Sequence, residues 1–383
     1  VCGATSTSNV AVAAGPVALA RSQTIDLFVE LVGGSDGPAK AAVTAALEAG
    51  KPVVTANKAL MAEHGLELAA LAEARGVPLL YEAAVMGGTP AVKMLREGLV
   101  GDEVASVSGI LNGTCNFILS EMEAKGLPFA AVLAEAQRLG YAEADPTMDV
   151  GGYDAAHKIT LLAALAFGGA PDYASAEIEG VESVAPLDIR MARDLGYRIK
   201  LIASAERVDG SVSVRVQPSL VPLGHPLAQA GGALNALFIE GRRIGRIFLQ
   251  GPGAGAGPTA AAVAADIADV LAGGARPVFS RRAALLEPLP ALRPESRTAK
   301  AYIRLIVRDQ PGVIAAVTET LAASEVSIDS FLQKPVEDHD GVPIVLTTQE
   351  APESRLQEVV RRIAALAFVL EPPRLFRLVG AGR

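Results

Sequence analysis

The sequence predicts an α/β protein with three structural units. Apolar strands alternate with helices between residues 26 and 85, which is typical of a parallel sheet with crossover helices. Residues 91–250 combine helices with segments that alternate apolar and polar side chains, and residues 300–383 follow a βαββαβ order. A chain of 383 residues is also too long for one ordinary core, so several domains are expected.

The first unit is expected to be a Rossmann-like parallel-sheet domain formed by residues 1–90 together with about 251–272. Its predicted elements are strand 26–32, helix 38–49, strand 52–56, helix 59–75 and strand 77–85. A glycine follows each helix, as is favoured at helix C-termini. Residues 251–272 add a glycine-rich loop and a long helix. No element is predicted for the first 25 residues.

The second unit, residues 91–250, is expected to be an α+β substrate domain. Helices are predicted at 90–98, 116–123, 128–139 and 155–167. Segments 211–221 and 236–251 alternate as half-buried antiparallel strands do. Helices should therefore cover one face of an antiparallel sheet.

A linker at residues 273–299, rich in Pro, Arg and Ala, leads to a C-terminal domain at 300–383. The predicted elements of this domain are strand 301–307, helix 311–323, strand 326–333, strand 342–349, helix 352–366 and strand 368–379. This order is the ferredoxin-like βαββαβ topology.

The composition excludes several classes of protein. A net charge of −8 argues against a general nucleic-acid binder, which needs basic surface to displace counterions. No uninterrupted apolar run approaches the roughly 20 residues of a membrane helix. Cys2 and Cys115 are too few for a disulfide framework or a cysteine metal site. The expectation is a cytoplasmic enzyme that acts on a small molecule.

Two loops lie where open parallel sheets bind ligands, beyond the carboxyl ends of the strands. Gly33 and Gly34 follow the first predicted strand, and Asn57 and Lys58 follow the second. Glycines let the backbone approach a ligand, and a lysine there neutralises phosphate or holds a polar substrate group. The alternative is that the glycines only form a turn and that Lys58 is a solvated lysine at a helix start.

Residues 140–158 concentrate charged side chains, among them Glu143, Asp149, Asp154 and Lys158. Asp154 and Lys158 are four residues apart and share a helix face, which in the simplest case is a surface ion pair. The helix they begin is apolar around most of its circumference and should be buried. A buried Asp–Lys pair suits proton transfer, because an alcohol that loses hydride must also lose its hydroxyl proton.

Glu82 ends the third predicted strand and precedes a turn. One carboxylate with several turn carbonyls suits a monovalent cation, since hard cations favour oxygen ligands. An equally good interpretation is a helix cap, in which the carboxylate accepts from the first amides of the following helix.

Three other patterns are weaker. The glycines at 253, 255 and 257 alternate, whereas the dinucleotide fingerprint is G-x-G-x-x-G after a strand, so this loop would at most close over a bound cofactor. Cys115 would suit a nucleophile, but no histidine lies near it in the sequence, and a small packing residue is the better interpretation. The four histidines show no metal-ligand spacing.

Six motifs occur in order between residues 26 and 272. They are VELVGG (29–34), VTANKALMAEHG (54–65), YEAAVMGGTPAV (81–92), GILNGTCNFIL (109–119), LGYAEADPTMDVGGYDAAHKI (139–159) and GPGAGAGPTAAAVAADI (251–267). Together they resemble the homoserine dehydrogenase family. Through VRDQPGVIAAVTETLAASEVSI (307–328), the C-terminal domain is similar to ACT domains, which sense amino acids.

The resemblance implies an NAD(P)-dependent oxidoreductase that interconverts L-homoserine and L-aspartate 4-semialdehyde in threonine, methionine and isoleucine biosynthesis. It implies NADP or NAD as cofactor and a structural sodium ion. It also implies threonine as a candidate allosteric effector, and a homodimer or homotetramer joined through the substrate-domain sheets. No nucleic-acid or membrane partner is expected.

Matching positions imply roles for individual residues. Lys158 is the expected proton donor, and Asp154 is its partner in acid–base chemistry. The expected substrate-binding residues are Glu143, Asp149, Lys58, Thr114 and Asn112. The expected cofactor contacts are Gly33, Lys58, Gly140 and Gly255. The expected sodium ligands are Glu82 and the backbone carbonyls of Val85, Gly87 and Thr89.

One family feature has no counterpart in the sequence. The family begins with a strand and a G-x-G-x-x-G loop, and no such pattern precedes residue 26. By this resemblance, the first unit (residues 1–90 with about 251–272) is a truncated dinucleotide-binding domain, whose pyrophosphate-binding part we expect to lie outside this chain or to be replaced. No residue indicates a choice between NAD and NADP. Two alternatives therefore stay open: an amino-acid-sensing regulatory protein with a degenerate catalytic fold, and an acylating semialdehyde dehydrogenase that uses Cys115.

Overall fold

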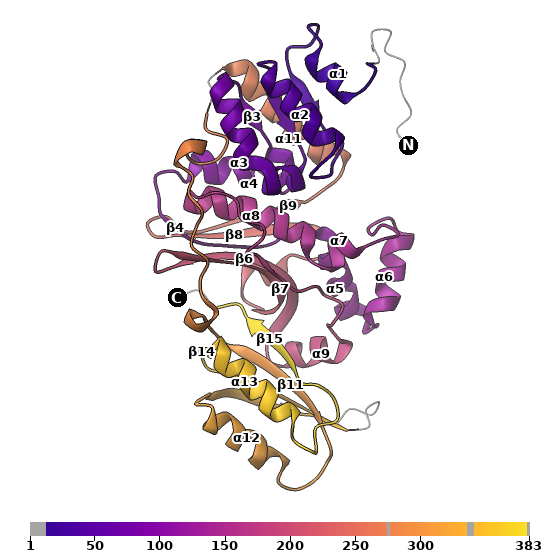
Figure 1. Ribbon diagram of the computed structural model, residues 1–383. Helices are drawn as coiled ribbons and strands as arrows, with labels where there is room; N and C mark the ends of the chain where they lie inside the picture. Colours follow the sequence, from indigo (N-terminus) through magenta and orange to yellow (C-terminus); the bar gives the residue numbers. More distant parts are fainter. Residues whose placement is uncertain (1–12, 274–275, 335–340, 381–383) are drawn as a thin grey trace.

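The structure, a computed structural model, describes residues 13–273, 276–334 and 341–380 (Figure 1). The molecule is elongated, with the N-terminal unit at one end, the C-terminal unit at the other and a large sheet between them (Figure 1). None of the described helices is both long enough and apolar enough to cross a membrane.

The first unit contains a parallel sheet in the order β1-β2-β3. Its strands are β1 (Phe28–Glu30), β2 (Val53–Thr55) and β3 (Leu79–Leu80). Its helices are α1 (Pro16–Arg21), α2 (Pro38–Glu48), α3 (Lys58–Arg75) and α11 (Ala256–Ala272). Alternate residues of β2 face opposite sides of the sheet, so that Val53 packs in the main core and Val54 packs with Val263 of α11. The predicted strand–helix alternation is confirmed.

The third predicted strand is shorter than expected. After Leu80 the chain turns into a 3₁₀ helix, η1 (Glu82–Ala84), and α4 (Ala91–Lys93) continues directly into a π-helix, η2 (Met94–Gly98). The predicted helix 90–98 is therefore helical throughout but has only one regular α turn.

The second unit contains the longest strands of the protein. They are β4 (Val104–Ile110), β6 (Tyr197–Val208), β7 (Ser211–Pro222), β8 (Leu234–Gly241) and β9 (Gly245–Pro252), with a short β5 (Glu177–Ile178) beside β7. Its helices are α5 (Gly113–Lys125), α6 (Phe129–Arg138), α7 (Thr147–Val150), α8 (Tyr153–Phe167), α9 (Pro186–Asp194) and α10 (Pro226–Gln229). Helix α8 lies across β4, β6 and β7 (Figure 1).

Two features of this sheet differ from the sequence interpretation. The segment 236–251 is a hairpin rather than one continuous strand, because the chain turns between Gly241 and Gly245, where Gly245 has a φ of 74°. Strand β6 was not predicted, although its residues alternate and it pairs with β7 along its whole length.

The C-terminal unit has the predicted βαββαβ order. Its elements are β11 (Ala301–Val307), α12 (Val313–Ala323), β12 (Ile328–Gln333), β13 (Val342–Thr348), α13 (Glu353–Ala364) and β15 (Arg374–Leu378). The short strands β10 (Thr298–Ala299) and β14 (Ala351–Pro352) pair beside it.

The C-terminal unit and the substrate domain share one ten-stranded sheet. Its order is β12-β13-β11-β15-β7-β6-β4-β8-β9, with β5 beside β7. The join is a parallel pairing in which Arg377 and Leu378 of β15 lie opposite Ser219 and Leu220 of β7. The sequence gives no sign of this join, because a pairing between domains depends on their docking.

The predicted linker packs along the molecule. Val278 and Phe279 are each 1% exposed, and the Phe279 ring lies 5.8 Å from the ring of Tyr81. The amide of Ala283, at the start of η3 (Ala283–Leu285), donates to the carboxylate of Glu73 on α3. A last 3₁₀ turn, η4 (Pro294–Ser296), precedes β10.

A buried ion pair adds to the contact between the two lower units. Arg304 of β11 donates through Nε to Oδ1 of Asp188 on α9 (2.6 Å), and Asp188 is fully buried. The hydroxyl of Tyr302 donates to the same oxygen (3.2 Å). The charge of Asp188 is thus compensated by a side chain from the C-terminal unit.

Replacing Arg304 by methionine should destabilise the protein, because it removes the buried cationic partner of Asp188. Breaking a buried pair from one side costs about 3–5 kcal/mol, which urea denaturation would record as a lower midpoint. The control is Arg355→Met, since Arg355 and its partner Glu325 are both exposed. Equal midpoints for the two variants would contradict a stabilising contact between the units.

Candidate active site

Polar side chains organise the loops at the carboxyl edge of the three-stranded sheet. Glu30, at the end of β1, is 1% exposed, and its carboxylate accepts from the hydroxyl of Thr55 (2.5 Å) and from the amide of Gly33 (2.9 Å). Asn57, after β2, donates to the carbonyl oxygen of Gly34 (2.7 Å). The two loops are therefore joined to each other, and the amide of Gly33 is already used within the protein.

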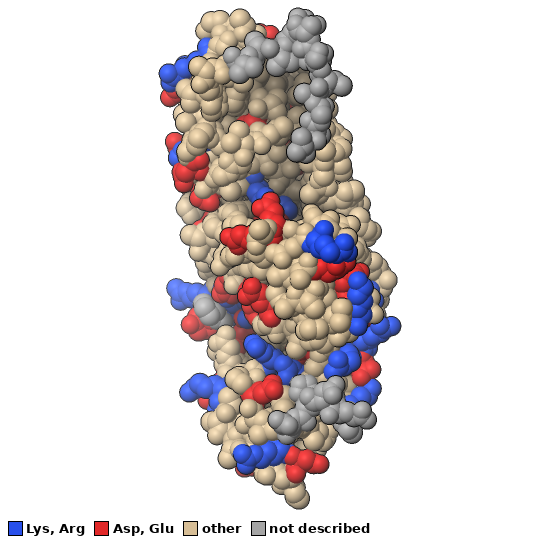
Figure 2. All heavy atoms as spheres, turned by 90° about the vertical axis from the view of Figure 1, so that its right-hand side faces the viewer, with Lys and Arg blue, Asp and Glu red and all other residues tan. Residues whose placement is uncertain are grey.

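Apolar side chains flank the same edge. Leu31 is 61% exposed and Val32 is 68% exposed, directly before Gly33. Exposed apolar surface beside a glycine loop, at the carboxyl edge of a parallel sheet, suits the flat rings of a dinucleotide. Figure 2 shows a hollow in the upper part of the molecule, with acidic and basic side chains gathered below it.

Lys158, on α8, lies at the centre of the site. Its ammonium group donates to the backbone carbonyl of Leu111 (2.8 Å) and to Oδ2 of Asp154 (2.8 Å), and the residue is 8% exposed. A lysine ammonium has three N–H donors. The described residues provide these two acceptors, which leaves one donor for a substrate oxygen.

Asp154 is held between two lysines. Its Oδ2 pairs with Lys158, and its Oδ1 lies 3.0 Å from Nζ of Lys58, the first residue of α3. Burial alone would raise the pKa of this carboxyl, but the two ammonium groups and the hydrogen bond from Asn112 outweigh it and hold the pKa below its ordinary value. Asp154 therefore stays ionised at neutral pH, where it orients and stabilises the ammonium instead of donating a proton.

Asn112 connects α5 to both carboxylates. Its side-chain oxygen caps the helix by accepting from the amide of Cys115 (2.8 Å), which fixes the direction of the amide group. Its Nδ2 donates to Asp149 (2.7 Å) and to Asp154 (2.8 Å). Burial raises the pKa of Asp149, and the charge of Asp154 adds to this rise against the opposing hydrogen bond from Asn112.

Thr114 and Glu143 are the two remaining predicted substrate residues, and a hydrogen bond from the Thr114 side chain lowers the pKa of Asp149 against the effect of burial. The hydroxyl of Thr114 donates to the backbone carbonyl of Tyr141 (2.8 Å) and so joins α5 to the loop that carries Glu143. Glu143 is exposed, and no described residue makes a polar contact with its carboxylate. The structure brings together Lys158, Asp154, Asp149, Asn112 and Lys58, and leaves the Glu143 carboxylate outside their hydrogen bonds.

Glu82 caps the following helix. Its two carboxylate oxygens accept from the amides of Val92 (3.0 Å) and Lys93 (2.8 Å). Burial raises the pKa of the carboxyl to about 7, and no cationic side chain among the described residues lies within ion-pair distance of it. Each oxygen keeps a further lone pair, so the cap leaves room for the cation interpretation.

The turn after Glu82 contacts the glycine loop before α11. A Cβ added to Gly87 would lie 2.9 Å from the carbonyl oxygen of Gly253, and one added to Gly88 would lie 3.1 Å from Pro258. Gly255, just before α11, has a φ of 123°. The predicted sodium segment and the predicted cofactor loop are therefore in contact.

The other predicted backbone positions are placed as follows. Gly140 follows α6 with a φ of 79°, and its amide donates to Gln137 (3.1 Å). The carbonyl of Thr89 accepts from the amide of Ala91 (2.8 Å), and Val85 directly follows η1.

Cys115 is a packing residue in this structure. It is fully buried, its thiol donates to the backbone carbonyl of Asp149 (3.1 Å), and burial raises the pKa of the thiol well above its ordinary value. A catalytic thiolate requires the opposite shift. The environment of Cys115 therefore argues against the acylating hypothesis.

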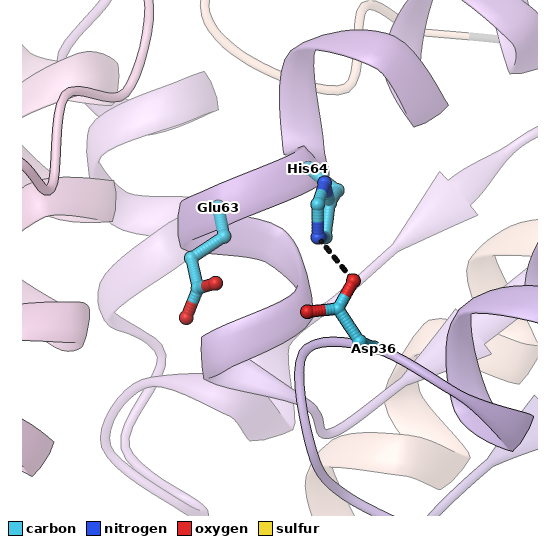
Figure 3. A group of neighbouring side chains, drawn as sticks. All are labelled: Asp36, Glu63 and His64. Atoms are coloured by element: carbon cyan, nitrogen blue, oxygen red, sulfur yellow. Dashed lines mark hydrogen bonds and ion pairs between the residues drawn. The ribbon is translucent and has the colours of Figure 1, made fainter.

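A separate polar group lies on α3 and on the loop after β1 (Figure 3). His64 Nε2 is 3.1 Å from Asp36, and a carboxylate oxygen of Glu63 lies within 4.8 Å of both. Sequence spacing could not reveal this group, because Asp36 belongs to another element. The ammonium of Lys40 lies 3.1 Å from the other ring nitrogen of His64, and this positive charge opposes metal binding.

Three contributors to the site were missed in the sequence. Glu30 lies in a run of apolar residues, and Asn235 lies in the apolar strand β8. A single polar residue in an otherwise apolar strand could have identified each of them as a candidate site residue. The carbonyl of Leu111 has no signal in a sequence, since its role depends only on backbone direction.

Three family models match successive parts of the chain. Residues 5–82 match the NAD-binding domain of homoserine dehydrogenase, residues 90–268 match homoserine dehydrogenase, and residues 301–368 match the ACT domain. A homoserine dehydrogenase of Neisseria gonorrhoeae is 42% identical over 369 residues, which are 95% of this chain and 85% of the relative. The chain belongs to the homoserine dehydrogenase family.

Solved structures agree with this assignment. A homoserine dehydrogenase from Thiobacillus denitrificans has a TM-score of 0.90 and 42% identity, with 96% of this chain and 85% of that chain covered. A hyperthermophilic archaeal homoserine dehydrogenase in complex with NADPH has a TM-score of 0.60 and 28% identity, with 67% of this chain and 75% of that chain covered.

Membership of this family favours the homoserine dehydrogenase hypothesis over the two alternatives, a regulatory protein with a degenerate catalytic fold and an acylating dehydrogenase. Homoserine dehydrogenases are NAD(P)-dependent oxidoreductases that interconvert homoserine and aspartate 4-semialdehyde, and this chain carries their NAD-binding, catalytic and ACT domains. The resemblance found in the sequence is confirmed.

Replacing Cys115 by serine should leave turnover within about threefold of the wild-type value, because serine can keep the bond to the Asp149 carbonyl and no step uses the thiol. Steady-state oxidation of NADPH with aspartate semialdehyde measures this. Loss of more than about a hundredfold with an unchanged melting temperature would restore a nucleophilic role for Cys115.

Proposed function

We propose that Lys158 transfers the proton during interconversion of homoserine and aspartate semialdehyde, with Asp154 as the fixed anion that orients it. The observation that carries this proposal is the ammonium group of Lys158, which is held by Leu111 and Asp154 and whose third donor meets no acceptor among the described residues. A partly buried lysine beside a carboxylate is a suitable acid and base for an alcohol–aldehyde pair.

The atoms balance in both directions. The nicotinamide cofactor, when bound, would supply the hydride acceptor and donor for C4 of the substrate. In oxidation the neutral amine of Lys158 takes the hydroxyl proton while the C–O bond becomes a carbonyl. In reduction its ammonium form donates that proton to the developing alkoxide. Asp154 remains ionised throughout, because Lys58 and the hydrogen bond from Asn112 still favour the carboxylate form when Lys158 is neutral.

The substrate is proposed to lie between Lys158 and the loop 140–146. Lys58 contacts substrate or cofactor at the mouth of the site, since its side chain is 37% exposed while its ammonium pairs with Asp154. Asp149 and Glu143 provide carboxylates for the amino group, and Asn112 and Thr114 shape the pocket at the start of α5. Because Glu143 is exposed, its role requires the loop to close over the substrate.

The cofactor is proposed to bind along the carboxyl edge of the three-stranded sheet. Exposed Leu31 and Val32 fit its rings, and Gly33, Gly140 and Gly255 are the positions of close backbone approach. The amide of Gly33 is engaged by Glu30, so the contact from this glycine would come from its carbonyl or Cα. The choice between NADP and NAD stays open.

A sodium ion is proposed beside Glu82. The residues fit it: the carboxylate is buried, forms no ion pair with a described side chain, and has its pKa raised to about 7 by burial, and the turn carbonyls of Val85, Gly87 and Thr89 follow it. The ion would offset the buried charge and fix the turn that contacts Gly253.

Threonine is proposed as an effector of the ACT domain, and a homodimer or homotetramer as the assembly. A pocket of about 260 Å³ lies at the loop between β11 and α12, lined by Asp309, Gln310 and Gln333 among others. The first amides of α12 suit a carboxylate and Asp309 suits an amino group.

The proposed assembly would join subunits at the edge of the large sheet. Strand β9 is the last strand of this sheet, and Phe248 on β9 is 37% exposed, so it offers apolar surface for a second subunit.

Replacing Lys158 by alanine should lower kcat by about 10²–10⁴-fold, because general acid–base groups contribute that much. Binding of NADPH, followed by fluorescence titration, should persist. The control is Lys125→Ala, since Lys125 lies at the exposed end of α5 and its one ion pair within the described residues is with Glu121. Retention of more than a tenth of wild-type turnover by the Lys158 variant would contradict its assigned role.

Threonine at about 100 times its Kd should raise the melting temperature of the full chain, because a ligand at that excess stabilises the folded state by about 2.7 kcal/mol. Asp309→Ala should abolish this rise by removing the carboxylate for the amino group. Glu319→Ala, on the exposed face of α12, should keep it. An equal rise in both variants would place the effector elsewhere.

A further inference from the structure

We propose that Asn235 is a positioning residue for proton transfer, which acts by holding the backbone carbonyl that fixes Lys158. The proposal rests on the role assigned to Lys158 above. It adds a residue from β8, outside the helices that supply Lys158, Asp154 and Asn112.

The carbonyl oxygen of Leu111 accepts two hydrogen bonds. One comes from Nζ of Lys158 (2.8 Å) and the other from Nδ2 of Asn235 (3.0 Å). A carbonyl oxygen has two lone pairs, so these donors use both. The direction of this carbonyl therefore depends on Asn235, and the position of the Lys158 ammonium depends on the carbonyl.

The backbone at Leu111 also influences the position of the two carboxylates, Asp149 and Asp154, through the next residue, Asn112. Leu111 joins the end of β4 to Asn112, whose side chain binds Asp149 and Asp154. A rotation of the Leu111 carbonyl would thus displace an acceptor of Lys158 and shift the residue that holds its carboxylate partner. Asn235 restrains both movements through one bond.

The burial of Asn235 indicates that its amide has a purpose other than packing. The residue is 1% exposed in the apolar sequence LNALFIEG, and its Oδ1 has no hydrogen-bond partner among the described residues. Leaving an amide oxygen unpaired in a core is unfavourable. Leucine would fill a similar volume without this cost, so the bond to Leu111 is what the asparagine adds.

Asn235 also contacts the glycine loop before α11. It pairs with Gly251 in the β8–β9 ladder, and a Cβ added to Gly253 would lie 2.2 Å from its Cγ. Its side chain is therefore confined between the Leu111 carbonyl and the loop that leads to Gly255. This confinement holds the amide in the orientation that donates to Leu111.

Two variants of the full chain test the proposal by steady-state homoserine oxidation. Asn235→Leu should lower kcat about tenfold and change KM for homoserine by less than about threefold, because orientation is lost and substrate contacts remain. Asn235→Asp places a carboxyl at this buried position, where desolvation favours its protonated form and the carboxyl O–H can replace the bond to Leu111. It should therefore retain more of the wild-type kcat than Asn235→Leu does.

The matched control is Thr160→Val on α8. Thr160 is 1% exposed and its hydroxyl has no partner among the described residues, so this is an isosteric change from polar to apolar that touches neither Leu111 nor Lys158. It should leave kcat unchanged. If the Asn235 variants lose thermal stability but keep the wild-type kcat, the residue serves the fold alone and the proposal is overturned.

Gly253→Ala gives a third test if the Asn235 variants do not fold. It leaves the asparagine in place but forces its side chain to move, so kcat should fall while KM for homoserine changes little. An unchanged kcat would overturn the proposal. Turnover in Lys158→Ala would refute the proposed function itself, whereas an inactive Lys158→Ala beside wild-type behaviour at positions 235 and 253 would refute only the positioning role.

Discussion

The active site depends on one buried carboxylate that is shared by two domains. Asp154 of α8 pairs with Lys158 on its own helix and with Lys58 on α3 of the NAD-binding unit. A lone carboxylate could not remain ionised at this depth, and each lysine would lose its orienting partner without it. Two ammonium groups therefore face one shared carboxylate. The same ion pairs that stabilise the contact between the domains thus prepare the site for its chemistry.

The large sheet supports this carboxylate from below. Strand β4 ends at Ile110, and the next two residues are Leu111, which accepts from Lys158, and Asn112, which caps α5. Strand β4 pairs with β6, β6 with β7, and β7 with β15 of the ACT domain. A continuous series of paired strands therefore connects the ACT domain to the strand that ends next to the carbonyl bonded to Lys158.

The sequence predicted those parts of the structure that depend on local pattern. The spacing of Asp154 and Lys158 placed both on one helix face, and the apolar character of α8 predicted their burial. Strand β6 was missed, and the hairpin of β8 and β9 was taken for one strand, because alternation does not show where a strand reverses. For Glu82 two interpretations were open, and the structure adds the helix cap without excluding a cation.

The contacts that could not be predicted are those between elements distant in the sequence. Two examples are the pairing of β15 with β7 and the ion pair between Lys58 and Asp154. Neither contact produces a periodic pattern in the sequence, because each depends on how whole domains dock. Glu143 shows the converse. The sequence motif identifies Glu143, yet its carboxylate is exposed in the structure. A motif in a loop predicts which residue is present, but it does not predict which conformation the loop adopts.

Helix α3 is restrained at both ends, and this limits how the two upper domains can move. Its first residue, Lys58, is bound to Asp154, while Phe279 of the linker packs against Gly65 and the carboxylate of Glu73 holds the amide of Ala283. A rotation of the NAD-binding unit that pulled on α3 would break these contacts together. On the side of α11, Lys93 of α4 pairs with Asp266 (3.7 Å) and Asp269 (2.6 Å), and the backbone of Gly253 closely approaches Gly87. Polar contacts therefore tie the NAD-binding unit to the second unit at α11 as well as at α3, where Lys58 stays at its carboxylate.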